Sequence, residues 1–348
     1  MNRDTEIKKI RDILENTHRP MIMFDSDADG LTSFLMIYNF IKDGKGVYIK
    51  GDLNVENGYL TAINNYSPDR VIILDKPKVS NGFLSKVKVP ILWIDHHPIH
   101  PSHSKTDYFN PLLFDEKDTR PTSYWVYKIL EEKKFLWLAM AGNIGDWQIT
   151  DIKKDFIEKY PDLLDEKVVS PPEALFNSKI GKIAKIIDFS LKGTGKQVTT
   201  NVKILTRIED PYELLDEKTP KAKFIIKHFN KVNTKYQEIL KSVNAKDKKL
   251  ISYFYRDNGL AASATLSNEI QYQNPKKFIV VAREKSGSVF CSVRSQIHNV
   301  QALLGKILPE FNGASGGGHI HACGSHLQSA DYPHFIERIK QEMDDFLE

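Results

Sequence analysis

The sequence predicts an α/β protein with two domains, and three observations lead to this prediction. The N-terminal half alternates short apolar runs with segments of helical length, which is typical of a parallel sheet covered by helices on both faces. The C-terminal part mixes strand-like and helical segments a second time. The chain has 348 residues, which is long enough for two domains that each bury a core.

Four apolar runs in the N-terminal half are expected to form buried parallel strands. These runs cover residues 21–25, 46–53, 70–75 and 89–95. Three of them end in aspartate, at Asp25, Asp75 and Asp95. In an open parallel sheet the binding site forms beyond the carboxyl ends of the strands, so these three carboxylates indicate where the functional site lies.

We expect an N-terminal α/β domain over residues 1–190, a helical connector over residues 191–245 and a smaller α/β domain over residues 246–348. Three strands are predicted in the last domain, and a Lys-Ser-Gly turn joins the second and third as a hairpin. They cover residues 249–255, 276–284 and 288–295.

The expected connector includes a basic amphipathic helix. Its lysines recur every four residues, on roughly the opposite face from its apolar side chains. They are Lys223, Lys227, Lys231 and Lys235. Most charge runs of this kind are solvated helix faces, and the other interpretation is a binding surface for a polyanion. The sequence leaves both interpretations open.

Composition narrows the class of protein. The formal net charge of +4 permits a polyanionic partner without requiring one. The chain has only two cysteines, so a disulfide scaffold is excluded and a reducing compartment is the default. No apolar run approaches the length of a membrane span, and the N-terminus is too charged for a signal peptide. We therefore expect a cytoplasmic protein with no membrane partner.

The densest group of charged residues is the sequence DSDADG at residues 25–30. It places Asp25, Asp27 and Asp29 at alternate positions in a strand-to-helix turn, where the three carboxylates repel one another. Divalent cations bound through oxygen are the usual means of offsetting such repulsion. Helix capping is the alternative, but it accounts for one aspartate and not for three. An EF-hand loop is excluded, because the glycine comes too early and no glutamate follows at the required distance.

Two further motifs extend this group. Asp95, His96 and His97 end the fourth apolar run, and imidazole ligates transition metals well, so the mixture suits Mn²⁺ better than Ca²⁺. The sequence GNIGD ends an apolar helix and contributes Asp146. Its glycines are also what an ordinary helix C-cap would show, so this motif is weak alone.

The C-terminal domain carries a glycine-rich segment that could bind an anion. Gly316, Gly317 and Gly318 let the backbone approach a ligand closely and direct several N–H groups at it. His319 adds a possible charged donor, and Arg294 could contact phosphate through two N–H groups. An ordinary turn is the alternative. Together with a carboxylate-rich metal site, the phosphate interpretation is favoured.

These motifs, in this order, resemble those of the DHH–DHHA1 phosphoesterase superfamily, which is named for the triplet at residues 95–97. The sequence DSDADG resembles its first motif in the form found in RecJ-like nucleases, and Asp75 and Asp146 match its second and fourth motifs. Residues 316–324 resemble the GGGHxxAxG sequence of the DHHA1 domain. The chain resembles archaeal RecJ-like single-strand exonucleases and nanoRNases, which share this two-domain architecture.

The resemblance implies two divalent metal ions, with Mn²⁺ preferred over Mg²⁺. It also implies an active site in the cleft between the domains. The implied metal ligands are Asp25, Asp27, Asp29, Asp75, His96 and Asp146. Asp75 would bridge both ions, and His97 would contact the scissile phosphate. Arg294, His319 and the three glycines would grip phosphate. The implied mechanism is in-line attack of hydroxide on phosphorus without a covalent enzyme intermediate.

The resemblance therefore implies a two-metal phosphodiesterase, a RecJ-like exonuclease that degrades single-stranded DNA or RNA to mononucleotides from the 5′ end. One alternative is a nanoRNase or cyclic-dinucleotide phosphodiesterase with very short substrates. Another is a replisome-associated member of the superfamily, with a replication or repair protein as partner. Because every metal-ligand position is filled, we do not expect a scaffold that has lost its metals.

Overall fold

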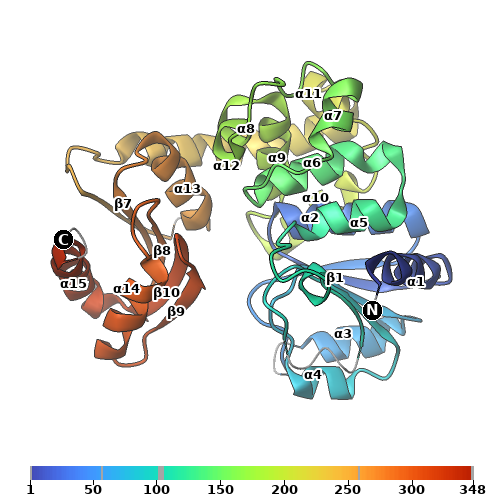
Figure 1. Cartoon of the computed structure of the whole chain (residues 1–348), viewed down its shortest axis with the longest axis horizontal. Helices are drawn as coiled ribbons and strands as arrows, with labels where there is room; N and C mark the ends of the chain where they lie inside the picture. Colours follow the sequence, from blue (N-terminus) through green and yellow to red (C-terminus); the bar gives the residue numbers. More distant parts are fainter. Residues whose placement is uncertain (1, 56–57, 101–105, 258, 346–348) are drawn as a thin grey trace. The chain divides into compact units, whose positions relative to one another are not determined.

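The computed structural model describes residues 2–55, 58–100, 106–257 and 259–345 (Figure 1). The chain divides into two units, Met1–Phe229 and Asn230–Glu348. Each unit is built around one five-stranded sheet. The predicted α/β architecture, with a parallel N-terminal sheet and a second, smaller α/β region, is confirmed.

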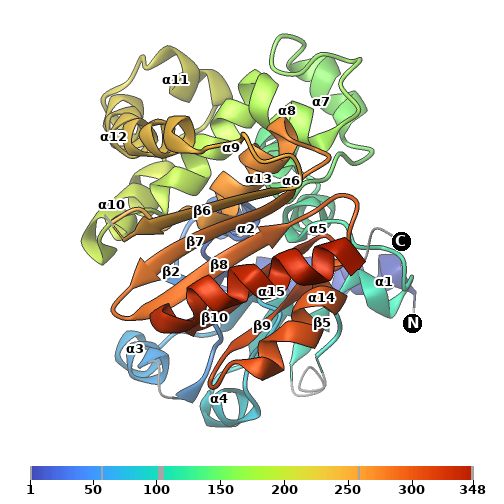
Figure 2. The same ribbon diagram turned by 90° about the vertical axis from the view of Figure 1, so that its left-hand side faces the viewer.

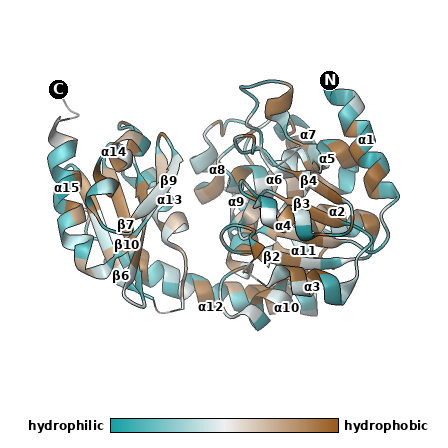
Figure 3. Ribbon diagram, turned by 90° about the horizontal axis from the view of Figure 1, so that it is seen from below, coloured by the Kyte–Doolittle hydropathy of each residue, from teal (hydrophilic) through white to brown (hydrophobic). Residues whose placement is uncertain are grey.

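The sheet of the first unit is parallel throughout, with strand order β2-β1-β3-β4-β5. Its strands are β1 (Met21–Asp25), β2 (Lys45–Ile49), β3 (Val71–Leu74), β4 (Ile91–Ile94) and β5 (Asp107–Phe109). The central strands β3 and β4 are buried over their whole length, as their apolar sequences predict, and both are coloured as hydrophobic in Figure 3. The edge strand β5 was not predicted, because three residues are too short for a periodic signal.

Helices cover both faces of this sheet, as a parallel sheet requires. The helices of the first unit are α1 (Arg3–Glu15), α2 (Ala28–Ile41), α3 (Tyr59–Tyr66), α4 (Asn81–Lys86), α5 (Thr122–Leu130), α6 (Leu136–Gly145), α7 (Lys153–Lys159), α8 (Pro171–Asn177), α9 (Lys179–Ser190), α10 (Gly195–Leu205) and α11 (Pro211–Asp216). Ile63 of α3 and Phe83 of α4 join Trp93 and other strand side chains in one core layer. On the opposite face, α2 packs against β1 and is itself covered by α5, α6 and α9 (Figure 1).

The region expected as a connector, residues 191–245, is helical over most of its length. It contains α10, α11 and the long helix α12 (Pro220–Ser242). The division between the two units falls inside α12, after Phe229. Lys223, Lys227, Lys231 and Lys235 are exposed, and most apolar side chains of this helix are buried, with Phe224 (46% exposed) as the main exception, so the predicted amphipathic pattern is confirmed. Within the described ranges, no helix has both the length and the apolarity to cross a membrane.

The sheet of the second unit is mixed, with strand order β6-β7-β8-β10-β9. Its strands are β6 (Leu250–Arg256), β7 (Phe278–Lys285), β8 (Ser288–Arg294), β9 (Ser315–His319) and β10 (Ala322–Gln328). Only β6 and β7 are parallel. The predicted hairpin joins β7 to β8, and its turn residues Ser286 and Gly287 both have positive φ, 52° and 78°.

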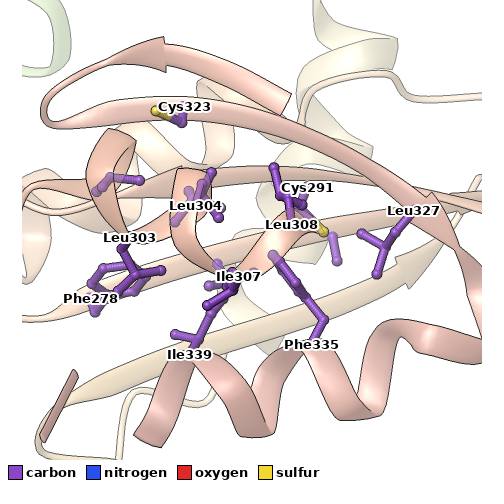
Figure 4. Packing of buried hydrophobic residues seen from close by; sticks show 14 of the residues in the cluster. Phe278, Cys291, Leu303, Leu304, Ile307, Leu308, Cys323, Leu327, Phe335 and Ile339 are labelled. Carbon is purple, nitrogen blue, oxygen red and sulfur yellow. The ribbon is translucent and has the colours of Figure 1, made fainter. Parts of the chain in front are cut away.

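The core of the second unit lies on one face of this sheet. Helices α14 (Val300–Ile307) and α15 (Tyr332–Asp345) lie on this face (Figure 2). Alternate side chains of the strands, Cys291 and Leu327 among them, belong to the core cluster there (Figure 4). Helix α13 (Ser263–Gln273) packs against β7 and β8 from the other side. Both cysteines are buried free thiols.

The glycine-rich segment forms a strand, so the ordinary turn considered as an alternative is wrong. Gly316, Gly317 and Gly318 lie in β9, the exposed edge strand that pairs with β10. A Cβ atom on Gly316 would come within 2.7 Å of the Leu308 side chain, and one on Gly318 within 2.4 Å of the Ala322 carbonyl oxygen. Two of the glycines are therefore required by strand packing. A Cβ on Gly317 would meet nothing within 4 Å.

Candidate metal centre

Three aspartates lie together at the carboxyl ends of neighbouring strands of the parallel sheet. Asp25 is the last residue of β1, while Asp75 and Asp95 directly follow β3 and β4. These three strands are neighbours in the sheet, and the Asp75 amide donates a hydrogen bond to the Ile94 carbonyl oxygen at 3.0 Å. The predicted meeting of the strand-end aspartates is therefore confirmed.

Asp75 is the most constrained of these residues. It is 1% exposed and has a left-handed backbone with φ of 59°, which is unfavourable for a residue other than glycine. One carboxylate oxygen, Oδ1, accepts a hydrogen bond from the Thr122 hydroxyl at 3.1 Å. Burial raises the pKa of Asp75 well above its ordinary value, and the charges of Asp29 and Asp27 raise it further. A buried, strained carboxylate among like charges indicates a place for a cation.

His96 presents one ring nitrogen to this carboxylate. Its Nδ1 lies 3.1 Å from the Thr119 carbonyl oxygen, and because a carbonyl only accepts, Nδ1 carries the proton. The Nε2 atom lies 3.4 Å from Asp75 Oδ1 and 3.7 Å from Asp146 Oδ2. Burial alone would lower the pKa of His96, but these carboxylates outweigh burial and raise it well above its ordinary value. In the neutral ring, Nε2 is the atom available to a metal.

Asp29 is held by the N-terminus of α5. Its two carboxylate oxygens accept hydrogen bonds from the backbone amides of Thr122, at 2.8 Å, and Ser123, at 2.9 Å. These amides are among the first of the helix, which have no partner within the helix itself. Each oxygen keeps a second lone pair, and donor atoms of Asp29, His96 and Asp146 lie within 4.8 Å of one another.

Two glycines bring Asp146 to this group. Asp146 directly follows α6, and this helix packs closely on α2 and α5. A Cβ atom on Gly142 would lie 2.3 Å from the Thr32 hydroxyl oxygen, and one on Gly145 would lie 2.6 Å from the Ala28 Cβ. The glycines of the GNIGD sequence therefore permit close helix packing, which corrects the C-capping interpretation. Burial raises the pKa of Asp146 to about 7.

His97 is oriented by Asp95, a residue to which sequence reasoning assigned no role of its own. The His97 Nδ1 lies 2.8 Å from Asp95 Oδ1. Asp95 is 1% exposed, and its other oxygen, Oδ2, has no hydrogen-bond partner among the described residues. Asp95 accepts a hydrogen bond from His97 Nδ1–H, which leaves Nε2 as the ring nitrogen that can face a ligand. The signal in the sequence was an aspartate two residues before the histidine at a strand end.

Asp25 and Asp27 lie in the turn between β1 and α2. Asp25 accepts hydrogen bonds from the Ser26 amide at 2.7 Å and from the buried Lys76 ammonium at 3.0 Å. Burial and the charge of Asp27 raise the pKa of Asp25 to about 6 despite that lysine. Asp27 is the N-cap of α2 and accepts from the Gly30 amide at 2.9 Å. Capping therefore accounts for this one aspartate.

The side chains at this edge fit divalent cations. The structure brings two groups of donor atoms within 4.8 Å, Asp75 with His96 and His97, and Asp29 with His96 and Asp146. Within the part of the chain that is described, neither group includes Asp25 or Asp27. Carboxylate oxygens with imidazole nitrogens suit Mn²⁺, and carboxylates suit Mg²⁺. Lys76, Thr122 and Ser123, which sequence reasoning missed, hold three of these carboxylates in place.

The predicted phosphate-binding residues of the second unit lie on one face of its sheet. Arg294 and His319 are each paired with Ala322 across the strands, so all three residues share a face. The Arg294 Nε donates to Asn268 Oδ1 at 2.6 Å, and its Nη1 donates to the carbonyl oxygens of Val293 and Cys323. These bonds fix the guanidinium, and Nη2 has no partner among the described residues.

Comparisons with known proteins agree with this geometry. Residues 20–155 match the DHH family, N-terminal domain, and residues 246–347 match the DHHA1 domain. No curated protein sequence matches the chain. The structure is similar to RecJ from Thermus thermophilus in complex with Mn²⁺, with a TM-score of 0.70, 17% identity and coverage of 97% of this chain. The match covers 54% of that RecJ, so the chain spans about half its length.

Two shorter proteins are also similar in structure. The pGpG-specific phosphodiesterase from Vibrio cholerae has a TM-score of 0.54 and 14% identity, with coverage of 94% of this chain and 99% of that one. CDC45 from Entamoeba histolytica has a TM-score of 0.53 and 9% identity, with 99% of both chains covered. At these identities the likeness establishes the fold. The chain brings together carboxylates and histidines that could hold a metal ion, and it belongs to the DHH–DHHA1 superfamily.

Proposed function

We propose that the protein is a two-metal exonuclease that hydrolyses single-stranded DNA or RNA to mononucleotides from the 5′ end, with Mn²⁺ preferred over Mg²⁺. One observation carries this proposal. Donor atoms of carboxylates and two histidines, drawn from different motifs of the sequence, gather around Asp75 and His96. The two groups overlap at His96, so all of these donor atoms lie in one cluster.

Roles follow from the contacts of each side chain. Divalent ions held here would polarise a phosphodiester and lower the pKa of water. Asp75 would bridge the two ions, because it is a central, buried carboxylate. His96 would offer Nε2 while Thr119 fixes its tautomer. His97, held by Asp95 through Nδ1–H, would contact a phosphate oxygen through a protonated Nε2 and could transfer that proton to it.

The remaining ligand positions complete the proposed set. We assign Asp25 and Asp27 to one ion and Asp29 and Asp146 to the other. Asp29 would bind its ion while its two oxygens also accept hydrogen bonds from backbone amides of α5. These hydrogen bonds fix the orientation of the carboxylate. Arg294, His319 and the backbone around Gly317 would bind phosphate in the second unit.

A phosphodiesterase of very short substrates is the second candidate. The observation that favours it is the likeness to the pGpG-specific phosphodiesterase, of which 99% is covered, against 54% of the Thermus RecJ. The likeness to CDC45 supports the proposal that either enzyme has a replication or repair protein as a partner. A scaffold without activity is disfavoured, because Asp75, His96 and Asp146 stand together with their supporting hydrogen bonds.

The test offers the chain DNA and RNA oligonucleotides from two to about 30 nucleotides, labelled at the 5′ or the 3′ end, with Mn²⁺ or EDTA. The exonuclease proposal expects Mn²⁺-dependent release of mononucleotides from long strands, beginning at the 5′ end. Hydrolysis of dinucleotides alone would establish the second candidate instead. Absence of Mn²⁺-dependent hydrolysis on every substrate would contradict both.

A further inference from the structure

The face of the C-terminal sheet that points away from α14 and α15 carries three cross-strand rows. Figure 4 shows Cys291, Cys323 and Leu327 on the core side of β8 and β10, so their immediate neighbours in each strand point to the other face. We call this other face the open face, although α13 covers part of it over β7 and β8. The strand register gives the residues of each row on β8, β10 and β9.

The first row is aromatic. Phe290 of β8 is paired with His326 of β10, and their ring centroids lie 5.0 Å apart. On the other side of Phe290, the guanidinium carbon of Arg283 lies 5.6 Å from the ring centroid. Phe290 therefore has a neighbour on each flank, yet it is 38% exposed. The ring lies between a guanidinium placed over it and a tilted imidazole, and the exposed part of this aromatic row can stack a base.

The second row has almost no side chains. Gly324 of β10 lies between Ser292 of β8 and Gly317 of β9. A Cβ atom on Gly324 would have its nearest neighbour at 3.9 Å, and one on Gly317 would meet nothing within 4 Å. No packing demand requires glycine at these two positions, in contrast to Gly316 and Gly318. Ser292 is buried, but the backbone at Gly324 and Gly317 is exposed, and a ligand can approach it closely.

The third row holds the proposed phosphate contacts, Arg294 and His319, on either side of Ala322. Arg294 lies four residues beyond Phe290 on the same strand, which places the two about 13 Å apart along β8. None of the residues of the three rows on β8, β9 and β10 is acidic. From the third row to the first, the open face thus presents side chains that can bind phosphate, a row with almost no side chains, and an exposed aromatic ring.

We propose that Phe290, supported by His326, stacks a base of single-stranded nucleic acid whose neighbouring phosphate is held by Arg294 and His319, while the strand crosses the glycine row. The occupant is single-stranded because only an unpaired base exposes its ring face to a side chain. The cationic residues match its phosphates in charge. Stacking accepts every base, so this platform adds affinity without sequence preference. The inference rests on the proposed function and extends it to a named contact.

The test measures binding of a single-stranded oligonucleotide to the full chain in an Asp75→Asn background, which prevents turnover. Phe290→Ala should weaken affinity at least about fivefold, the lower end of what base stacking contributes. Phe290→Leu keeps the apolar volume and should lose nearly as much, whereas Phe290→Tyr should restore binding. Phe254→Ala is the matched control, since Phe254 is 41% exposed on the opposite face, beside Tyr332, and should bind as the parent does.

A second arm uses oligonucleotides with one abasic position moved along the strand. In the parent, one position should reproduce the loss seen in Phe290→Ala, and the variant should be insensitive to that position, because the two changes remove the same contact. If Phe290→Leu and Phe254→Ala bind equally while the wild-type chain hydrolyses the same oligonucleotide, the platform is wrong and the proposed function stands. If the wild-type chain neither binds nor hydrolyses it, both fail.

Discussion

The strand-end site of the first unit and the open face of the second unit are opposites in physical character. Around Asp75 the side chains are acidic, buried and held by hydrogen bonds from several helices and loops. On the open face the ligand-facing groups are cationic, aromatic or bare backbone, and much of β9 is exposed. Burial and fixed geometry suit chemistry at one atom, while exposure suits a long flexible substrate. Substitutions in the two regions should therefore damage different quantities, the rate in one and the affinity in the other.

The largest loss is expected from Asp75→Asn. An amide cannot replace a carboxylate that neutralises two cations, so hydrolysis should be abolished while the fold is kept. Initial rates in Mn²⁺ measure this. Asp43→Asn is the control, because Asp43 is exposed and caps only its own turn. More than a tenth of wild-type kcat/KM remaining in Asp75→Asn would show that the bridging role is wrong.

Asp95→Asn should lower turnover by about 10²- to 10⁴-fold, the usual contribution of an oriented acid–base group. Asparagine fits the same space but no longer fixes the proton on His97 Nδ1, whose hydrogen bond to Asp95 measures 2.8 Å. Mn²⁺ binding, followed by calorimetry, should be unchanged. A variant with normal turnover would mean that His97 needs no orienting carboxylate.

In the second unit, Arg294→Ala and His319→Ala should weaken substrate binding and lower turnover by about 10²-fold, since misplaced phosphate reacts slowly. Neither change should remove a metal, because both residues lie in the unit that lacks the carboxylate site. Calorimetric titration with Mn²⁺ distinguishes this from a folding defect. Loss of metal binding in Arg294→Ala would assign that residue to folding or coordination.

The lysines of α12 should show a smaller effect, confined to long strands. If Lys223, Lys227, Lys231 and Lys235 contact phosphates, affinity for a long strand falls with salt by a log–log slope of about 0.7 per neutralised phosphate. Changing all four to glutamine should flatten that slope and leave dinucleotide binding unaltered. An unchanged slope on a long strand would identify the lysines as a solvated helix face.

The smallest effect concerns stability without metal. The pKa values of Asp25, about 6, and Asp146, about 7, exceed the ordinary 3.8, so both groups bind protons more tightly in the folded state and stability falls as pH rises through this range. His96, with its pKa above 6.5, acts in the same direction. The melting temperature in EDTA should therefore fall from about pH 5 to about pH 8, and Mn²⁺ should reduce the fall. A melting temperature that rises with pH in EDTA would contradict the raised pKa values of these buried carboxyl groups.

The strand ends were predictable because their signals are local. An apolar run followed by aspartate defines both a buried strand and its functional end, and the order of parallel strands then brings Asp25, Asp75 and Asp95 together. The spacing of apolar residues likewise predicted the amphipathic helix α12, and the turn residues predicted the β7–β8 hairpin.

The supporting contacts were not predictable, because they join residues far apart in the chain. The amides that hold Asp29 come from residues 93 and 94 positions away, and the lysine that pairs with Asp25 is 51 positions away. The glycine strand β9 was missed for another reason. Glycine is depleted in strands, so three in succession predict a loop, and only the packing of Leu308 and β10 against them explains why they are extended.

Single-turnover hydrolysis of one labelled oligonucleotide, measured over a range of enzyme concentrations in Mn²⁺, tests the division between the two regions most directly. For Asp75→Asn we expect no cleavage at saturating enzyme, although the oligonucleotide is still bound. For Phe290→Leu we expect the concentration at half-saturation to rise while the rate at saturation stays near that of the wild type. If Asp75→Asn instead cleaves at the wild-type rate once saturated, the strand-end carboxylates do not perform the chemistry and the account is wrong.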